Sequence, residues 1–505
     1  MVTLALALEP SDGPVFLRIA RALSRDIRRG RLRPGALLPG SRSLAASLGV
    51  HRNTVLAAYR ELDAEGWIET QPARATRVKR ELPEERPLAW GARATRRRLK
   101  RASETLGFDL PAAPTFASLA GRDPVVSSTG SGPIALYGGL PELGSFPIVE
   151  LTRAYRRAAT AERGAPLGYG DPMGEPALRA AVAAFLSSTR GVVAEVEDVF
   201  ITRGSQMALF LAAAVLLRPG DVVAVEARGY APAWAALRAS GAELVPIPVD
   251  DEGLDVERLA TLARARPIRA VYLTPHHQYP TTRLLSPARR LALLELCEAH
   301  RMIALEDDYD HEFHYDGRPV LPLASADVAG SVVYFGTFSK VLAPSLRLGF
   351  VVAPRPVLRA MCERRVLVDR QGDRLLELAV AELFEGGEVV RHVRRMRRLY
   401  HARREAMANG LDVHFGERAR FTLPPGGMAI WSAFEGVDVE LWATRAAERG
   451  VLLHTGRRFA FDGRPSPHLR LGFAGQSEAR IEQALARMRQ CLPPRPGRGL
   501  RAARG

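Results

Sequence analysis

Lysine is rare in this sequence, and a single lysine occupies the long C-terminal region. Lysine and arginine together number 71, but only Lys79, Lys100 and Lys340 are lysines. A composition that uses arginine wherever charge is needed suggests a chemical reason for a retained lysine, because an amine can deprotonate and form an imine whereas a guanidinium cannot. Lys340 follows the apolar run Val332–Phe335 and is therefore a candidate nucleophile. The alternative is an ordinary surface lysine after a strand.

Acidic residues and a tyrosine follow a second apolar run. Glu306, Asp307 and Asp308 come directly after a strand expected over residues 302–305, and Tyr309 is next. A carboxylate at such a strand end can pair with a protonated ring nitrogen. A phenol two residues further on lies on the same side of extended chain and can bond a ring oxygen. Alone, an acidic pair after a strand is as often a helix cap.

Residues 202–208, with the sequence TRGSQMA, have the pattern of an anion site at a helix start. They open an apolar helix expected over residues 208–217, so that backbone N–H groups and the Ser205 hydroxyl are available to an anion. Arg347, seven residues beyond Lys340, supplies positive charge. A Gly-Ser-Gln before a helix is a weak signal by itself. Combined with Lys340 and Asp307, it predicts a site for pyridoxal 5'-phosphate (PLP).

Three segments in this region, LTPHHQYPT, EDDYDHEFHYDGRP and GTFSKVLAPSLRLGF, resemble the fold-type I aminotransferase domain of the MocR-type branch of the GntR family of transcription regulators. The resemblance extends from about Gly138 to Gln490. It implies that Lys340 binds the cofactor covalently, that Asp307 pairs with the pyridine nitrogen and that Tyr309 bonds the phenolate oxygen. It also implies phosphate contacts from Ser205, Gln206, Ser339 and Arg347.

The same resemblance implies further roles for three residues. Tyr230 stacks on the cofactor ring, Arg470 holds the α-carboxylate of an amino acid, and Tyr169 reaches the phosphate in a neighbouring subunit of a homodimer. Three positions differ from related proteins: Tyr279 and Thr282 differ from catalytic aminotransferases, and Pro232 differs from regulators that respond to γ-aminobutyrate. Tyr279 replaces an asparagine that bonds the cofactor, which weakens catalysis, and Thr282 replaces a turn glycine. Pro232 replaces a second carboxylate-binding arginine, which disfavours γ-aminobutyrate as effector, although Arg203 or Arg228 could substitute.

The N-terminal region contains a compact helical module. Val15, Ile19, Leu23 and Ile27 recur every four residues, and two shorter helical patterns and a strand follow. Helix, turn, helix and hairpin form the winged helix-turn-helix pattern. The segment LPGSRSLAASLGVHRNTVLAAYRELDAEGWIE resembles the DNA-binding domain of the GntR family, and the resemblance covers residues 14–80.

By this resemblance Arg42, Arg52, Asn53 and Thr54 face double-stranded DNA. Arg52 and Asn53, at the start of the recognition helix, suit contacts with base edges. Arg42 and Thr54 suit contacts with phosphates. Fourteen basic and seven acidic residues in 1–80 (14 − 7 = +7) favour DNA over a module for protein contacts. His51 replaces the usual Ser or Thr cap and predicts a less stable helix start. The wing tip, residues 71–76, lacks the usual glycines.

The elements that position these residues divide the chain into four parts. Residues 1–80 form the DNA-binding domain, 81–133 a linker with a basic run at 93–101, 134–492 the PLP domain, and 493–505 a disordered basic tail. From residue 134 apolar strands alternate with amphipathic helices, which predicts a mostly parallel α/β sheet with its site at the carboxyl ends of the strands.

Composition favours a cytoplasmic protein. No apolar run approaches the ~20 residues that span a bilayer, and the apolar start at residues 4–8 lacks the basic residues of a signal peptide. Three separated cysteines give no disulfide or metal framework, so no metal site is expected. The net charge of +16 suggests a polyanionic partner, although arginine bias alone also produces it.

Together these features predict a PLP-dependent transcription regulator. An amine or amino-acid effector, or PLP itself, would change how paired PLP domains hold the DNA-binding domains on an operator. The alternative is a catalytically active aminotransferase with an accessory DNA-binding domain.

Overall fold

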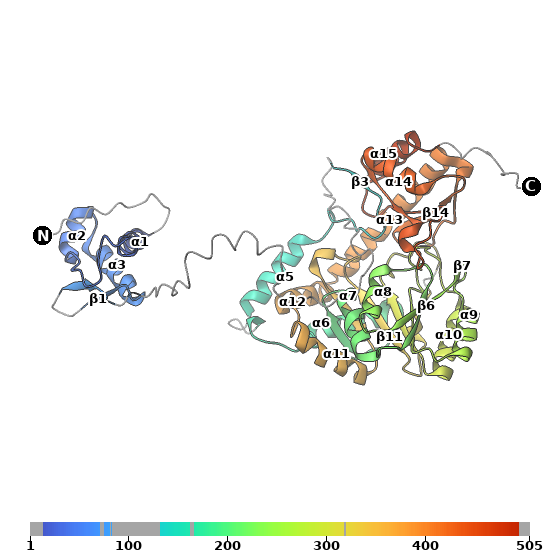
Figure 1. The fold of residues 1–505 in the computed structure, drawn as a ribbon, viewed down its shortest axis with the longest axis horizontal. Coiled ribbons are helices and arrows are strands. Elements are labelled where there is room, and N and C mark those ends of the chain that lie inside the picture. Colours follow the sequence, from blue (N-terminus) through green and yellow to red (C-terminus); the bar gives the residue numbers. More distant parts are fainter. Residues whose placement is uncertain are drawn as a thin grey trace, which may run out of the picture. The chain divides into compact units, whose positions relative to one another are not determined.

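The computed structural model describes residues 14–70, 75–80, 82, 132–161, 166–317 and 320–493. The chain divides into two compact units, residues 1–113 and 114–505 (Figure 1). Most of the expected linker, the wing tip at residues 71–74, the apolar start and all but the first residue of the expected tail lie outside the described residues. Within the described part of the chain, none of the helices has the length and apolar character needed to span a membrane.

The N-terminal unit has the expected helix-turn-helix and hairpin. Its helices are α1 (Val15–Arg28), α2 (Ser41–Leu48) and α3 (Arg52–Ala64), and its strands are β1 (Ile68–Thr70) and β2 (Thr76–Val78). The strands pair antiparallel. Ile19, Leu23 and Ile27 of α1 pack in one core with residues of α3 and the hairpin, which include Val55 and Ile68, whereas Val15 is 39% exposed. Gly49, with φ 64°, ends α2 in the left-handed region and makes the turn into α3.

The second unit is built on a sheet that has seven strands among the described residues. Their order is β4-β12-β11-β10-β9-β5-β6. All adjacent pairs from β11 to β6 are parallel, whereas β12 runs antiparallel to both of its neighbours. The expected mostly parallel sheet is confirmed, with β12 as the exception. The bounds are β4 (Val199–Thr202), β5 (Val222–Glu226), β6 (Glu243–Ile247), β9 (Ala270–Leu273), β10 (Ile303–Asp308), β11 (Val332–Thr337) and β12 (Gly349–Val352).

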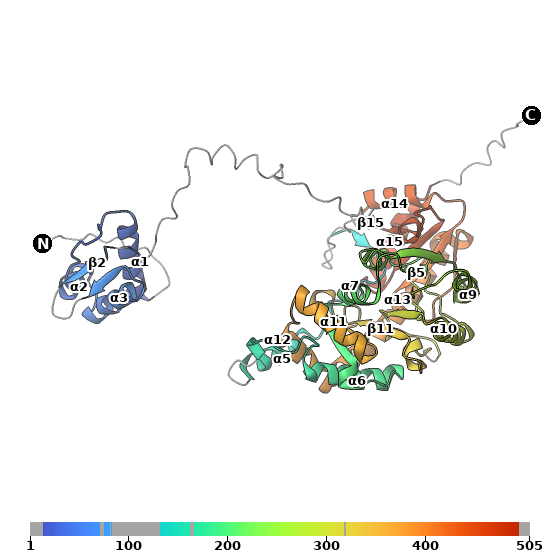
Figure 2. The same cartoon turned by 60° about the horizontal axis from the view of Figure 1, so that its bottom comes forward.

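Helices cover both faces of this sheet (Figure 2). Alternate residues of each strand enter different cores: in β11, Val332 and Tyr334 belong to one core and Val333 and Phe335 to the other. Burial on both faces explains why the central strands are continuous apolar runs. One face packs against α5 (Ile148–Thr160), α6 (Pro176–Arg190), α9 (Val256–Ala265), α10 (Pro287–His300) and α12 (Arg374–Glu385). The other packs against α7 (Ser205–Leu216), α8 (Ala231–Arg238) and α11 (Arg355–Val368).

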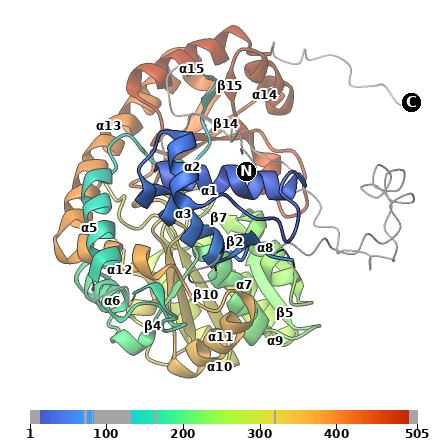
Figure 3. The ribbon, with the colours of Figure 1, turned by 90° about the vertical axis from the view of Figure 1, so that its left-hand side faces the viewer.

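A long helix, α13 (Glu388–Phe415), runs from the helices beside this sheet to a smaller C-terminal lobe (Figure 3). The lobe has an antiparallel sheet in the order β13-β14-β17-β16 and a third core. Its elements are β13 (Ala419–Phe421), β14 (Ala429–Phe434), α14 (Val439–Glu448), β15 (Val451–Leu452), β16 (His454–Thr455), β17 (His468–Gly472) and α15 (Glu478–Gln490).

Short elements complete the unit. Strand β3 (Ile134–Ala135) pairs in parallel with β15, which joins the start of the described second unit to the C-terminal lobe. Strands β7 (Val249–Asp250) and β8 (Gly253–Leu254) form a hairpin. The 3-10 helices are η2 (Val196–Asp198), η3 (Leu323–Ser325), η4 (Pro344–Leu346), η5 (Gly416–Arg418) and η6 (Gly456–Phe459).

Candidate cofactor site and DNA interface

A cavity of about 780 Å³ lies at the carboxyl ends of the central strands. Its walls come from the ends of β9, β10 and β11, the start of α7, the segment 137–140 and the C-terminal lobe. Most of the residues proposed from the sequence to bind a cofactor meet here. The wall includes Ser205, Gln206, Tyr230, Asp307, Tyr309, Ser339, Lys340 and Arg347.

Lys340 lies three residues beyond the end of β11. Its amine donates a hydrogen bond of 2.8 Å to the carbonyl oxygen of Gly139. Gly139 has φ 90°, and a Cβ there would lie 3.2 Å from the Lys340 Nζ atom, so glycine allows this close approach. Burial, with a smaller contribution from the positive charge of Arg470, lowers the pKa of the Lys340 amine to about 8. A larger fraction of this amine is therefore neutral, and nucleophilic, near neutral pH than for an ordinary lysine.

Asp307 lies in β10 and is buried. Its Oδ2 atom accepts a hydrogen bond of 2.8 Å from the Tyr272 hydroxyl, while Oδ1 has no hydrogen-bond partner among the described residues. Burial raises the pKa of the Asp307 carboxyl to about 7. A buried acceptor without a donor costs about 1–3 kcal/mol. The carboxyl group therefore fits a cationic donor in the cavity, as the protonated nitrogen of a pyridine ring would be.

Two tyrosines flank this carboxyl. The Tyr309 hydroxyl donates a hydrogen bond of 2.9 Å to the His277 carbonyl oxygen, and its oxygen can still accept another. Tyr230 immediately precedes α8, and its ring meets the Tyr279 ring edge to face at 5.5 Å. Burial raises the pKa of Tyr309 and of Tyr230 well above the ordinary value for tyrosine. Both hydroxyls consequently remain protonated at neutral pH.

The start of α7 and Arg347 converge at one end of the cavity. Ser205 is the first residue of α7, and Gly204 before it has φ 79°. A Cβ at Gly204 would lie 2.9 Å from the Arg347 Nη2 atom, so the guanidinium packs directly on this glycine. Gln206 donates 2.9 Å to the Pro232 carbonyl oxygen, and its Oε1 atom is buried without a partner among the described residues. N–H groups, a hydroxyl and a cation in one place fit a phosphate.

Arg470 and Tyr169 are not part of the cavity wall. Arg470 is 1% exposed, and its guanidinium lies 4.5 Å from the centroid of the Tyr279 ring. Gly138 covers it so closely that a Cβ at this glycine would overlap the Arg470 Nη1 atom. Tyr169 is 78% exposed and has the Arg370 guanidinium 4.1 Å from its ring centroid. The structure therefore separates Tyr169 from the other predicted site residues of the same chain, whereas Arg470 lies close enough to Lys340 for its charge to lower the pKa of that amine.

The departures in the expected cofactor site have specific structural outcomes. Thr282 retains the conformation expected of the replaced glycine, with φ 62°, a region that is strained for a β-branched residue. Pro232 lines the cavity. Two arginines could replace the missing one, but Arg203 pairs with Asp369 at 2.9 Å, and neither Arg203 nor Arg228 belongs to the cavity wall.

Several residues of the cavity wall were not predicted. Tyr137 and His454 stack with ring centroids 4.0 Å apart, and Arg458 follows them in η6. They reach the cavity because β3 pairs with β15, a contact between segments more than 300 residues apart. No motif marks them in the sequence. Tyr272 lies in β9 beside β10, and only the strand register reveals that it contacts Asp307.

In the N-terminal unit, Arg42, Arg52 and Asn53 are exposed and Thr54 is half-buried. Arg52 Nε donates a hydrogen bond of 3.3 Å to the Ser41 hydroxyl, which joins the starts of α3 and α2. The residue that replaces the usual Ser or Thr at the start of α3 has a defined role. His51 caps the helix, because its Nδ1 atom accepts a hydrogen bond of 3.2 Å from the Asn53 backbone N–H. The His51 imidazole thus accepts the capping hydrogen bond that a Ser or Thr hydroxyl usually accepts.

Comparisons with known proteins agree with both parts of the chain. Residues 16–78 match the family "Bacterial regulatory proteins, gntR family", and residues 142–488 match "Aminotransferase class I and II". The chain is 33% identical over 489 residues to a probable rhizopine catabolism regulatory protein, MocR, of Rhizobium meliloti, covering 95% of this chain and 94% of that protein. It is 34% identical over 492 residues to the HTH-type transcriptional regulator TauR of Rhodobacter capsulatus, covering 95% and 97%.

Solved structures resemble the second unit. LysN, an α-aminoadipate aminotransferase from Thermus thermophilus, aligns with a TM-score of 0.67 at 31% identity, covering 72% of this chain and 92% of that chain. A multiple substrate aminotransferase from Thermococcus profundus aligns with the same TM-score at 30% identity and the same coverage. The fold-type I aminotransferase architecture is confirmed.

Proposed function

Because this chain belongs to the MocR-type branch of the GntR family and is an HTH-type transcription regulator with an aminotransferase-like domain, we propose that it binds PLP in the 780 Å³ cavity and senses an amino compound there. One observation carries this proposal. The amine of Lys340, the buried carboxylate of Asp307 and the cationic start of α7 with Arg347 face a single cavity at the ends of the parallel strands.

The donors and acceptors of the cavity support a fit to PLP. Lys340 would hold the aldehyde carbon, Asp307 the ring nitrogen and Tyr309 the ring oxygen, with Tyr230 against the ring. The phosphate contacts would come from Ser205, Gln206, Ser339 and Arg347. When bound, PLP supplies an aldehyde that reacts reversibly with amines and a ring that accepts electrons.

The surroundings of Lys340 and Asp307 set the protonation states that this chemistry requires. The low pKa of Lys340 makes its amine available for reaction, and Gly139 holds that amine through its carbonyl oxygen. The Asp307 carboxyl, whose pKa is raised by burial, becomes an anion when a cationic donor approaches its free Oδ1 atom. Closure of the cavity by the segment 137–140 would exclude water from these groups.

An amino-acid effector requires a cation for its carboxylate. Arg470 has two buried nitrogens without hydrogen-bond partners among the described residues, and Gly138 and Tyr279 cover it. A movement of this cover would expose Arg470 to the cavity. Arg458 already lines the wall and is a second candidate. PLP itself is the alternative ligand to be sensed.

Regulation would follow if the ligand favours one arrangement of the DNA-binding units over another, because a ligand with equal affinity for both shifts nothing. We expect a homodimer that recognises two half-sites on double-stranded DNA in the cytoplasm. The exposure of Tyr169 supports a contact with the phosphate of the second subunit. Exposed Arg52 and Asn53 at the start of α3 support base contacts, with Arg42 and Thr54 at phosphates.

A catalytically active aminotransferase is the second candidate function. The set of groups around the cavity favours it, because the amine, the carboxylate and the phosphate contacts that transamination needs are all present. Sustained production of a keto acid from an added amino acid by the PLP-loaded protein would support this alternative. Operator binding that changes with PLP or an amine would support the regulator.

Genome-wide footprinting of the full-length protein tests the proposal directly. Wild type and Lys340→Ala are compared with and without PLP, and the visible absorption of bound cofactor is recorded for each. We expect PLP to produce a new absorption band and a changed set or strength of footprints in wild type alone. Identical spectra for the two proteins would contradict cofactor attachment at Lys340. Identical footprints with and without PLP would contradict ligand-dependent regulation.

A further inference from the structure

Three histidines form a buried cluster next to, but outside, the wall of the cofactor cavity. His276 and His277 follow β9, and His314 follows β10 and forms a bridge to Gly426. Their exposed fractions are 1%, 1% and 7%. One nitrogen of each ring can be chosen so that the three atoms all lie within 4.8 Å of one another. The cofactor proposal uses none of these side chains.

The ring nitrogens of this cluster are short of hydrogen-bond partners. Both nitrogens of His276 and the Nε2 atom of His277 have no partner among the described residues. Leaving a buried polar atom unsatisfied costs about 1–3 kcal/mol. A ligand that accepts one lone pair from each ring would satisfy several of these nitrogens at once.

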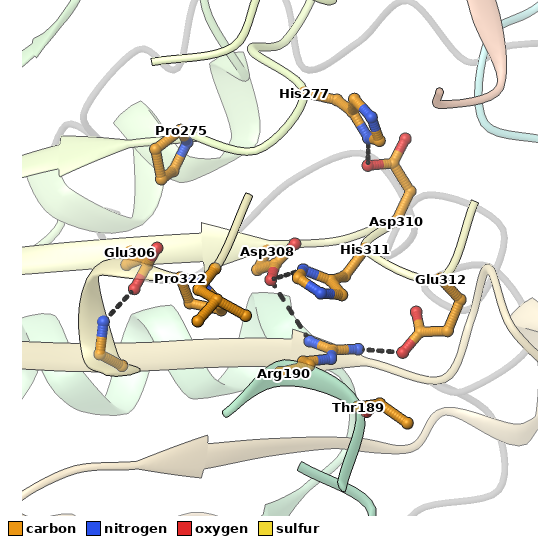
Figure 4. A network of polar contacts seen from close by, with 12 residues as sticks. Thr189, Arg190, Pro275, His277, Glu306, Asp308, Asp310, His311, Glu312 and Pro322 are labelled. Carbon is orange, nitrogen blue, oxygen red and sulfur yellow. Dashed lines mark hydrogen bonds and ion pairs between the residues drawn. The ribbon is translucent and has the colours of Figure 1, made fainter. Parts of the chain in front are cut away.

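Asp310 prepares His277 for that ligand. Its Oδ1 atom lies 2.8 Å from His277 Nδ1 (Figure 4). An aspartate at this distance accepts the Nδ1 hydrogen, which leaves the lone pair on Nε2. A carboxylate that orients a histidine in this way is typical of metal-binding histidines. Gly426 packs directly on this ring, because a Cβ there would lie 2.5 Å from His277 Nε2.

The surrounding charges favour a cation. Asp308, Asp310 and Glu312 are all buried, and the Arg190 guanidinium contacts Asp308 at 3.5 Å and Glu312 (Figure 4). The Nδ1 atom of His311 lies 2.9 Å from the Asp308 Oδ2 atom, so His311 is paired with Asp308. Asp310 pairs with His277, and its Oδ2 atom has no hydrogen-bond partner among the described residues. Positive charge beside His277 would balance this carboxylate.

We propose that His276, His277 and His314 bind a divalent transition-metal ion, with zinc the best fit. Imidazole nitrogens suit zinc, whereas magnesium and calcium require oxygen ligands. Nitrogens bound to one tetrahedral zinc lie roughly 3.4 Å apart, so the rings need to approach by on the order of 1 Å from the widest spacing. Three protein ligands leave a fourth position for water. The expectation of no metal site considered only cysteines.

The site would be connected to the cofactor cavity through the main chain. Tyr309 in the cavity wall donates its hydrogen bond to the carbonyl oxygen of His277, one of the metal ligands. A metal that fixes the His276–His277 segment would thereby fix the acceptor of the Tyr309 hydroxyl. Metal binding itself depends only on the histidines and Asp310, so it does not require PLP or Lys340.

Metal content of the full-length protein tests the proposal. Protein stripped with a chelator is dialysed against micromolar Zn²⁺, washed, and measured by plasma mass spectrometry. We expect about one ion per chain in wild type and in Lys340→Ala. His314→Gln and His276→Asn should each weaken binding by more than the ~10–100-fold that loss of an orienting partner causes. His300→Gln, which alters an exposed histidine at the end of α10, is the matched control and should retain the ion.

Cobalt spectroscopy of wild-type protein tests the same site without a variant, in case a histidine variant fails to fold. Co²⁺ bound to wild type by three imidazoles in a tetrahedral site gives intense visible bands, and we expect these bands to vanish on addition of excess Zn²⁺. A weak spectrum of hydrated Co²⁺, no retained zinc in wild type, or equal retention by folded His314→Gln would each overturn the proposal. Loss of PLP binding with retained zinc would contradict the cofactor proposal alone.

Discussion

Lys340 combines a partly buried amine with two nearby positive charges. Burial acts first, and Arg470 and Arg347 add to it, whereas Asp310 and Asp307 oppose it. The result, a pKa of about 8, is set by the surroundings of this residue rather than by its sequence neighbours. The chain keeps so few lysines that this amine is the only one in the part of the second unit that the structure describes.

The rate at which apoprotein takes up PLP should therefore depend on pH through this amine. Because the pKa is lowered, the neutral fraction of Lys340 rises about tenfold per pH unit below pH 8 and is nearly complete above it. We expect the uptake rate constant to rise between pH 6.5 and 8 and to level off by pH 9.5, measured by stopped-flow absorbance. Lys340→Arg is the control and should show no such uptake. A rate that continues to rise beyond pH 10 would contradict a depressed pKa.

The sequence predicted the chemistry of the cavity but not its C-terminal wall. Asp307 and Lys340 end neighbouring parallel strands, and the carboxyl ends of such strands meet at one edge of a sheet. Arg458 and His454 come from another lobe, and their position depends on a pairing between distant segments. Arg470 lies in β17, and its burial beneath Gly138 depends on the local fold of the segment 137–140.

Helix α3 presents its first residues to solvent while its later residues form the core. Val55, Ala58 and Leu62 are fully buried, whereas Arg52 and Asn53 are exposed. The cap by His51 and the hydrogen bond from Arg52 to Ser41 fix the first turn. The residues of α3 that are proposed to contact DNA are thus separated along the helix from those that form the core. Each group can therefore be tested independently.

Replacing Arg52 with alanine should weaken operator binding with little effect on stability. A bidentate contact between arginine and guanine contributes about 1–3 kcal/mol of discrimination, and an exposed side chain contributes little to folding. We expect the loss to be larger for the operator than for unrelated DNA, measured by fluorescence anisotropy at fixed salt. Arg60→Ala, an exposed arginine two turns further along α3, is the matched control. Equal losses for both variants, or equal losses on both DNAs, would argue against base reading by Arg52.

The order of elements was predictable, but the direction of one strand was not deduced. Alternating apolar runs and amphipathic helices predicted the parallel sheet, and β5, β9, β10 and β11 fit it. Strand β12 is antiparallel, because the connection 338–348 from β11 is shorter than the dozen or more residues that a parallel crossover needs. That connection contains Lys340 and Arg347, so the reversal returns the chain past the cavity with both side chains in its wall. An apolar run such as Gly349–Val352 has the same composition in either direction.

At the scale of the whole molecule, the two units have separate cores. The core of the N-terminal unit consists of residues between 19 and 78, and the three cores of the second unit begin at residue 134. Each unit therefore has the apolar packing that independent folding requires. A ligand that binds the cavity contacts residues of the second unit alone. Its binding energy should therefore stabilise that unit first.

Calorimetry of the full-length protein should reveal this separation as two unfolding transitions. PLP at about 100 times its dissociation constant adds about 2.7 kcal/mol to the stability of the state that binds it. We expect the transition of the larger unit, recognised by its greater enthalpy, to move to higher temperature while the smaller one stays in place. Lys340→Ala should reduce the shift without changing either transition of the apoprotein by a comparable amount. If PLP moved both transitions together in the absence of DNA, the two units would unfold as one cooperative unit. The ligand would then act on the DNA-binding unit through a folded contact rather than by changing how two independent units are held on an operator.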